Sequence, residues 1–233
     1  MDILLIAGLW LDGSAWKDVV PALKELGHRP VPITLPGQGD GAASATLEDQ
    51  VGAVLAAVDA APGPQVLVVG HSAACSLAWA AAEGRPERVA GVVLIGGFPS
   101  EDGDLYADFF EPKDGAVAFP GWEPFAGPDS DDLDEAARQA FESVAVSVPE
   151  AVTRGVMRLS NERRFDVPVS VLCPEFSPAQ AREWIEGGKV PELAKAKHVD
   201  YLDIESGHWP MFTRPTELAQ LLADAASAPH AER

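Results

Sequence analysis

The stretch from Val66 to Ala74, which is VLVVGHSAA, decides the fold of this chain. An apolar, strand-like run ends near Gly70 and passes through a tight turn at Ser72 directly into a helix-like run. Such a turn needs small residues two places before and two places after the serine, because neighbouring backbone comes close there and leaves the hydroxyl exposed above the sheet. Gly70 and Ala74 meet that requirement, although glycine is commoner at the second place. The stretch therefore predicts that Ser72 is a nucleophile, and the alternative is a serine that only caps the helix.

Similar apolar runs recur along the chain and alternate with longer, helix-like segments. That alternation is typical of βαβ units, which build a mostly parallel sheet with helices on both faces. Six strands are expected, at Ile3–Ala7, Val31–Leu35, Val66–Gly70, Val92–Gly96, Val169–Cys173 and Val199–Ile204. Helices are expected at Ser14–Leu26, Leu47–Ala61, Ala73–Glu83 and Pro215–Ala226, with Thr46 and Thr213 as caps of the second and the last.

Residues 99–166 form a stretch between the fourth and fifth strands that is too long for a simple crossover connection. We expect a helical cap insertion there, within a single domain whose core is residues 1–98 and 167–233. Helical spacing predicts one helix over 133–148 and a second around 152–159. The first part is rich in aromatic residues that either line a pocket or pack the insertion on the sheet: Tyr106, Phe109, Phe110, Phe119, Trp122 and Phe125.

The charge balance excludes some classes of partner. The 233 residues include 36 acidic and 17 basic side chains, a formal charge of −19, which repels nucleic acid and anionic lipid surfaces. Acidic groups such as Asp129 to Asp132 are most simply solvated faces. The first residues, MDILLIAG, carry an acid where a signal peptide is positive, and the apolar run is too short to cross a membrane, so a cytoplasmic protein is expected.

The two cysteines, Cys75 and Cys173, lie beside apolar runs and suit small buried thiols better than a disulfide. No metal-ligand spacing of histidine or cysteine is present, so neither a metal nor a cofactor is expected. The glycines of the segment from Pro36 to Gly41 do not match a dinucleotide fingerprint, and this segment is expected to be a loop at the rim of the site.

A serine hydroxyl needs a base to take its proton, and five histidines are available. His208 alone follows the carboxyl end of a predicted strand, where parallel sheets place their ligand crevice. His71 adjoins the serine with its side chain directed elsewhere, and His28, His198 and His230 stand before a strand, at a strand start and in the tail. The pattern predicts His208 as the general base.

Together these segments resemble the α/β-hydrolase superfamily over nearly the whole chain. The matching segments are Ala7–Trp10, Asp12–Trp16, Leu35–Gly39, Gly70–Ala74 and Ser206–Pro210. Within that superfamily the short insertion, the run Cys173–Glu175, Trp184, Met211 and Pro215 look like the branch of plant methyl-ester esterases and hydroxynitrile lyases. The first strand here corresponds to the third strand of that fold.

The resemblance implies an oxyanion hole made by two backbone amides, those of Ala73 and Leu9, with Trp10 as the alternative to Leu9. It also implies a carboxylate that orients His208. The aspartate of the family falls on Phe176 or Ser177, so Glu175 is the nearest acid. Glu101 and Asp102, which follow the fourth strand, are the competing acids.

The implied activity is that of a serine hydrolase that cleaves a small or medium hydrophobic carboxylic ester or lactone through an acyl-enzyme. A substrate pocket is expected around Trp10, His71, Phe98, Trp122 and Trp209. Two alternatives remain: a hydroxynitrile-lyase-like elimination, whose known enzymes carry lysine where this chain has Trp209, and a ligand-binding protein with weak turnover.

Overall fold

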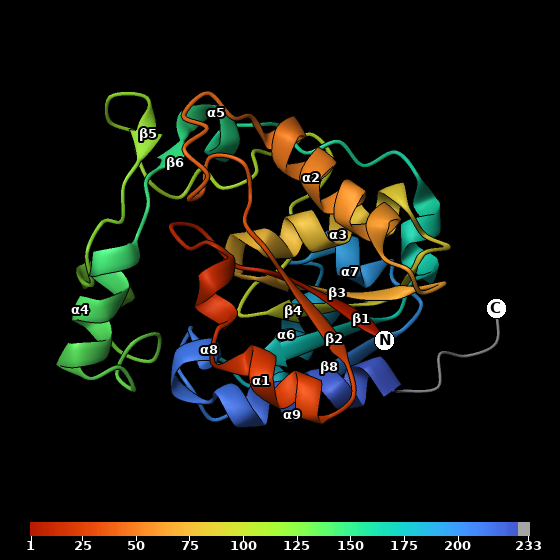
Figure 1. Ribbon diagram of the computed structural model, residues 1–233. Coiled ribbons are helices and arrows are strands. Elements are labelled where there is room, and N and C mark those ends of the chain that lie inside the picture. The colour runs from red at the N-terminus through yellow and green to blue at the C-terminus, as the bar shows by residue number, and fades with distance from the viewer. Residues whose placement is uncertain (228–233) are drawn as a thin grey trace.

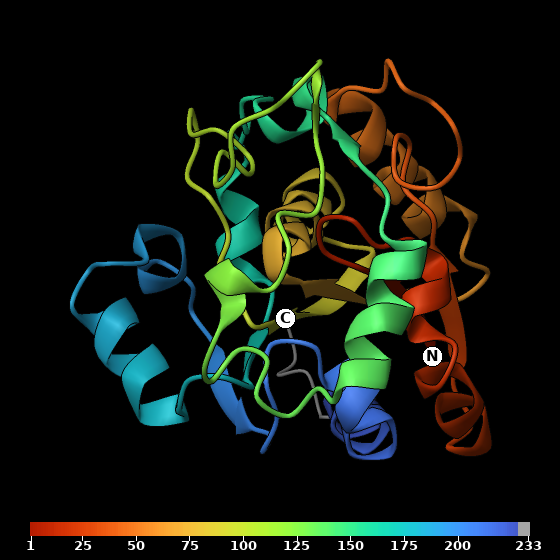
Figure 2. The ribbon, with the colours of Figure 1, turned by 90° about the vertical axis from the view of Figure 1, so that its left-hand side faces the viewer.

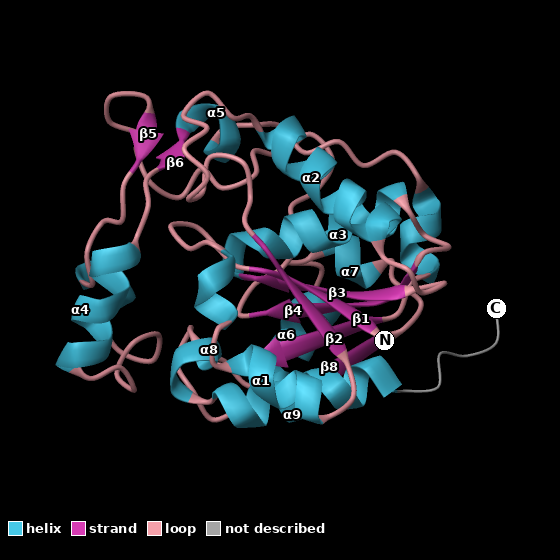
Figure 3. Cartoon of the chain, in the orientation of Figure 1, coloured by secondary structure: helices cyan, strands magenta, loops and turns pink. Residues whose placement is uncertain are grey.

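The computed structural model describes residues 1–227 and is built on one six-stranded sheet with helices on both faces (Figures 1 and 3). The strand order is β2-β1-β3-β4-β7-β8, and every neighbouring pair is parallel. The strands are β1 (Asp2–Ile6), β2 (Arg29–Ile33), β3 (Val66–His71), β4 (Val89–Ile95), β7 (Val169–Cys173) and β8 (Val199–Asp203). All six predicted strands are confirmed, with the largest shift at the start of β4.

Side chains alternate between the two faces of the sheet, as strand geometry requires. Leu4 and Ile6 of β1 pack in one core with helices α2 (Leu47–Ala60) and α3 (Cys75–Gly84). Ile3 and Leu5 pack in the other core with α1 (Val19–Glu25), α8 (Pro210–Thr213) and α9 (Pro215–Ser227). Figure 1 shows these two helix groups above and below the strands. Helices α6 (Pro178–Glu186) and α7 (Pro191–Ala194) add to the first core.

The helix ends differ in part from the prediction. Thr46 caps α2 in a capping box with Asp49, as expected. Thr213 is not a cap, because it ends α8 and its buried hydroxyl has no hydrogen-bond partner among the described residues. The predicted first helix is divided into a 3-10 turn, Gly13–Trp16, and α1, because the side chain of Asp12 binds the amide of Ser14 and starts a separate turn.

The segment between β4 and β7 lies beyond the carboxyl ends of the strands and faces the viewer in Figure 2. It contains the antiparallel pair β5 (Ala116–Val117) and β6 (Val148–Pro149), which was not predicted, and the helices α4 (Glu135–Val144) and α5 (Glu150–Thr153). The second helix that the sequence predicts in this segment, around 152–159, is wrong beyond the single turn of α5, which ends at Thr153. Val156 pairs instead with Leu105 in an antiparallel bridge, which holds the chain extended. The division into a core and a cap insertion stays a prediction.

No helix within residues 1–227 is long and apolar enough to cross a bilayer. His230, which the sequence excludes as the base, lies outside the described residues.

Candidate active site

The candidate residues follow the carboxyl ends of four different strands. Leu9 follows β1, Ser72 follows β3, Glu175 follows β7 and His208 follows β8. The carboxyl ends of parallel strands meet at one edge of a sheet, which is where such folds hold their ligands. The topology therefore gathers residues that are distant in sequence.

Ser72 occupies a tight turn between β3 and α3. Its φ is 56°, in the left-handed region that costs most residues about 1–2 kcal/mol. A Cβ on Gly70 would clash with the carbonyl oxygen of Ala74, and Ala74 itself is fully buried. Small residues at these two places thus permit the turn, and the turn carries the serine at the end of the strand.

His208 and Glu175 form a hydrogen-bonded pair. Nδ1 of His208 lies 2.9 Å from Oε1 of Glu175, and both side chains are largely buried, at 13% and 14% exposure. Gly96, with φ 59°, directly follows β4, and a Cβ there would lie 3.1 Å from Nδ1 of His208 and 3.3 Å from Oε2 of Glu175. A carboxylate on Nδ1 sets the tautomer that leaves Nε2 free to accept a proton.

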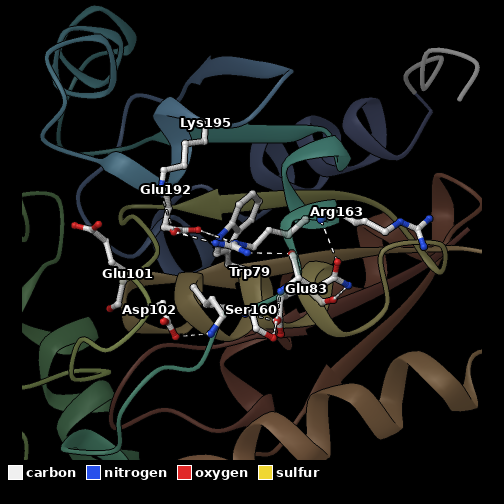
Figure 4. Close-up of polar contacts among 12 residues, drawn as sticks. Trp79, Glu83, Glu101, Asp102, Ser160, Arg163, Glu192 and Lys195 are labelled. Carbon is white, nitrogen blue, oxygen red and sulfur yellow. Dashed lines mark hydrogen bonds and ion pairs between the residues drawn. The ribbon is translucent and has the colours of Figure 1, made fainter.

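The competing acids are not hydrogen-bonded to His208. The carboxylate of Asp102, which is labelled in Figure 4, accepts from the backbone N–H of Leu159 at 2.8 Å and so holds the chain of the insertion segment. The backbone N–H of Glu101 donates to Asp104 at 3.3 Å. Glu175 is therefore the acid that the structure places on the histidine.

The two expected oxyanion amides both lie beside Ser72. Ala73 is in the first turn of a 3-10 helix that continues into α3, where backbone N–H groups lack an intrahelical acceptor. The loop of Leu9 packs directly on Ser72, as shown by Gly8, where a Cβ would lie 2.9 Å from Cβ of Ser72. No hydrogen bond within residues 1–227 uses the Leu9 amide. The Trp10 alternative has φ 67° and also lies at the cavity.

His71 is fully buried and connects two parts of the site. Its Nδ1 accepts from the N–H of Gly8 at 3.3 Å, and its Nε2 donates to the carbonyl of His208 at 2.8 Å. Burial, and then the neighbouring His208, hold the pKa of His71 well below its usual range. A neutral imidazole has one donor and one acceptor, which are the two roles used here.

A cavity of about 180 Å³ opens at Ser72. Its lining is mostly aromatic and contains no lysine or arginine: Leu9, Trp10, His71, Ser72, Phe109, Phe110, Phe125, His208 and Trp209. Of the expected pocket residues, Trp10, His71 and Trp209 lie in this lining. Phe98 does not, because it packs on Phe176 and Trp184, and Trp122 does not, because it packs edge to face on Trp209.

Three aromatic residues of the insertion, Phe109, Phe110 and Phe125, line the cavity. The aromatic-rich stretch of the sequence predicts that some of its residues line a pocket. Their spacing does not show which ones do, because Tyr106 of the same stretch is buried in the core instead.

The acidic run before α4 contacts the backbone of Gly207 and His208, which the sequence interpretation of a solvated face missed. The carboxylate of Asp132 accepts from the N–H of Gly207 at 2.8 Å, and the carbonyl of Asp129 accepts from the N–H of His208 at 2.7 Å. Burial, and then the nearby Glu175, raise the pKa of the Asp129 carboxyl. The insertion segment thus holds the backbone that carries the base.

Both cysteines are free and buried, as predicted. Burial raises the pKa of the Cys75 thiol, and it raises that of Cys173 to about 12. Both shifts disfavour the thiolate, which is the reactive form of a cysteine. Within the described residues no cluster of histidine, cysteine and acidic side chains is placed to hold a metal ion.

Solved hydrolase structures share the fold of this chain over nearly the whole of both chains. An extracellular alpha/beta-hydrolase from a Paenibacillus species has TM-score 0.77 and 20% identity, covering 97% of this chain and 98% of that chain. A pyrethroid hydrolase from Sphingobium faniae has TM-score 0.71 and 22% identity, covering 98% of each chain. A methylesterase from Arabidopsis has TM-score 0.76 and 14% identity, covering 97% of this chain and 99% of that chain. The α/β-hydrolase fold is confirmed.

Two relatives match the sequence in part. The carbendazim hydrolyzing esterase of Nocardioides sp. is 29% identical over 107 residues, 44% of this chain and 44% of the esterase. Epoxide hydrolase B of Mycobacterium tuberculosis is 32% identical over 98 residues, 40% of this chain and 28% of that enzyme. The matched region spans less than half the length of either relative.

Residues 3–221 match the Alpha/beta hydrolase family. This region runs from β1 into α9 and contains Ser72, Glu175 and His208. The chain therefore belongs to the alpha/beta hydrolase family.

Proposed function

We propose that this protein is a serine hydrolase that cleaves a small or medium hydrophobic carboxylic ester or lactone through an acyl-enzyme. The observation that carries the proposal is the His208–Glu175 pair at 2.9 Å, with His208 lining the same cavity as Ser72. A nucleophile, a base and a group that orients the base are the components that such chemistry requires.

The reaction proceeds in two steps. Oγ of Ser72 attacks the carbonyl carbon while Nε2 of His208 takes the hydroxyl proton, and the amides of Leu9 and Ala73 bind the oxyanion. His208 then gives the proton to the leaving alcohol, and an acyl group remains on Ser72. Water then attacks the acyl carbonyl while His208 takes a proton from it, and His208 returns this proton to Oγ of Ser72 as the carboxylic acid leaves. Each oxyanion donor is worth about 2.7–4 kcal/mol of the barrier in enzymes of this type.

The lining of the cavity supports an uncharged, apolar substrate. Five aromatic side chains surround it, among them Trp10, Phe110 and Trp209, and a cavity of about 180 Å³ accommodates only a compact group. The names of the similar proteins, an esterase, a pyrethroid hydrolase and a methylesterase, also favour hydrolysis of esters. A cytoplasmic location stays a prediction.

The lyase alternative receives no support from the residue after the base. Trp209 is 3% exposed and packs edge to face on Trp122, Phe125 and Phe141, so it contributes an apolar ring and no cation. A pure ligand-binding protein would not need the pairing of His208 with Glu175.

The test is hydrolysis of p-nitrophenyl esters from acetate to octanoate, combined with labelling by a fluorophosphonate and mass spectrometry of the labelled peptide. We expect turnover with a preference for the shorter esters and a label on Ser72. Ser72→Ala and His208→Ala should abolish both, while Ser143→Ala, a change at an exposed serine, should leave both unchanged. Saturable ligand binding without product, or a label elsewhere, would contradict the proposal.

A further inference from the structure

The turn from Gly8 to Leu11 carries the candidate oxyanion amide of Leu9 and has a strained backbone. The amide of Leu11 donates to the carbonyl of Gly8 at 3.4 Å, which closes the turn. Trp10 stands at the third place of the turn with φ 67°, where a turn of this kind normally has glycine. A non-glycine residue in that region persists only where its surroundings hold it.

A buried glutamine holds both ends of this turn. Nε2 of Gln38 donates to the carbonyl of Gly8 and to the carbonyl of Leu11, each at 3.0 Å, and the Gln38 side chain is fully buried. The carbonyl of Gly8 and the N–H of Leu9 belong to one planar peptide unit, and in a trans unit they point in opposite directions. A contact that sets the direction of the carbonyl therefore also sets the direction of the N–H.

The loop from Pro36 to Ala42 delivers Gln38 to this position. Gly37 and Gly39 flank it with φ of 79° and 102°, and a Cβ on Gly39 would lie 3.0 Å from the side chain of Asp12. Oδ1 of Asp40 accepts from the amides of Gly37 and Ala42 at 2.8 and 2.9 Å. The glycines of this segment thus allow the loop to place Gln38 against the turn, and they do not serve as a dinucleotide motif.

A second glutamine sets which end of the Gln38 amide faces the turn. Nε2 of Gln50, on α2, donates to Oε1 of Gln38 at 3.1 Å and to the carbonyl of Pro36 at 2.8 Å. With its oxygen occupied in this way, Gln38 presents its NH₂ group to the two carbonyls. Rotation of the amide by half a turn would lose all three hydrogen bonds.

We propose that Gln38 is a positioning residue for the oxyanion hole, which it orients through the Gly8–Leu9 peptide, with Gln50 as its support. The inference rests on the proposed function, because an oxyanion hole has a use only where a carbonyl is attacked. Gln38 does not touch the substrate, so its removal should weaken binding of the anionic tetrahedral state and leave binding of the neutral ester nearly unchanged.

The test compares Gln38→Met with a matched control, Gln65→Met, which also removes an Nε2 contact to a backbone carbonyl but lies at the opposite end of β3. For Gln38→Met we expect kcat on p-nitrophenyl butyrate to fall by about 10- to 100-fold, with KM within about 3-fold of wild type. Affinity for a phenylalkyl trifluoromethyl ketone, which adds to Ser72 as an oxyanion, should weaken by the same factor. Affinity for the matching methyl ketone should not change.

Wild-type kcat and ketone affinity in Gln38→Met would overturn the inference. A lower kcat with unchanged trifluoromethyl ketone affinity would also overturn it, because the loss would then lie outside the oxyanion hole. If Gln38→Met does not fold, the same measurements of kcat, KM and ketone affinity are made on Gln50→Met. We expect a smaller loss of kcat and of trifluoromethyl ketone affinity in that variant. A wild-type protein that hydrolyses no ester and binds no trifluoromethyl ketone would instead overturn the proposed function, and the inference with it.

Discussion

At the scale of single residues, the extra methylene of the Glu175 side chain compensates for its earlier place in the sequence. It stands before the place where the resemblance puts an aspartate, yet its longer side chain reaches Nδ1 of His208 at 2.9 Å. Gly96 leaves the space in which the two side chains meet. A glutamate two residues after β7 can thus bind the histidine in place of an aspartate one or two positions later in the sequence.

Replacement of that acid should reduce turnover while the nucleophile and the base remain. We expect Glu175→Gln to lower kcat on p-nitrophenyl butyrate by about 10²- to 10⁴-fold, since the tautomer of His208 is no longer enforced and the imidazolium is no longer stabilised. Glu101→Gln is the control and should retain wild-type kcat. Equal activity of Glu175→Gln and wild type would exclude Glu175 as the orienting acid.

The buried His71 should make stability depend on pH. Its pKa is lower in the folded protein than in the unfolded chain, so the unfolded chain binds the extra proton first. The free energy of unfolding should therefore fall as pH decreases below about 6.5, by at most about 1.4 kcal/mol per pH unit, until the folded form also titrates. Urea unfolding at pH 7.5 and 5.5 measures this change. His71→Gln should remove most of the difference, and an unchanged difference in that variant would assign it to other groups.

At the scale of elements, the insertion segment and the loop of the base act as one unit. The contact of Asp132 with Gly207 and that of the Asp129 carbonyl with His208 involve successive amides of the base loop. A Cβ on Gly207 would clash with Asp132 and Asp129, so glycine is required where the two segments meet. The position of the base thus depends on a segment that precedes α4.

Loss of the Asp132 contact should disturb the base without removing any catalytic group. We expect Asp132→Ala to lower kcat about tenfold with a smaller effect on KM, because the loop of His208 loses one of the two hydrogen bonds that it makes with the acidic run from Asp129 to Asp132. Asp132→Asn keeps an oxygen acceptor and should restore most of the activity, and Asp131→Ala, at the neighbouring exposed aspartate, should have no effect. Equal loss in the Ala and Asn variants would show that charge, and not the hydrogen bond, matters.

At the scale of the whole molecule, a buried ion pair connects the short segment before β7 with α7. Arg164 donates two hydrogen bonds to Glu192 of α7, at 2.8 and 3.1 Å, and the indole of Trp79 on α3 donates a third at 2.8 Å (Figure 4). Arg164 and Glu192 are 4% and 2% exposed. Burial by itself raises the pKa of Glu192, but the bonds from Arg164 and Trp79 outweigh it and hold that pKa below its usual value.

Removal of one partner should be costly, because the other charge stays buried. We expect Arg164→Met to lower the free energy of unfolding by about 3–5 kcal/mol, measured by urea denaturation. Arg163→Met is a matched control, since the pair of Arg163 with Glu87 is mostly exposed and should change stability by at most about 1 kcal/mol. A similar loss of unfolding free energy in Arg164→Met and Arg163→Met would contradict the larger contribution expected of the buried pair.

The strands, the helix after Ser72 and the roles proposed for Ser72 and His208 followed from the sequence by itself. They depend on apolar periodicity and on a local turn that tolerates only small neighbours, such as Gly70, and these act within a few residues of chain. Tertiary structure alone decided the rest. The partner of His208 is 33 residues away, the carboxylate that binds Gly207 is 75 away, and the carbonyl that binds Gln38 is 30 away. Contacts at such separations depend on how strands and loops pack, which no local pattern encodes.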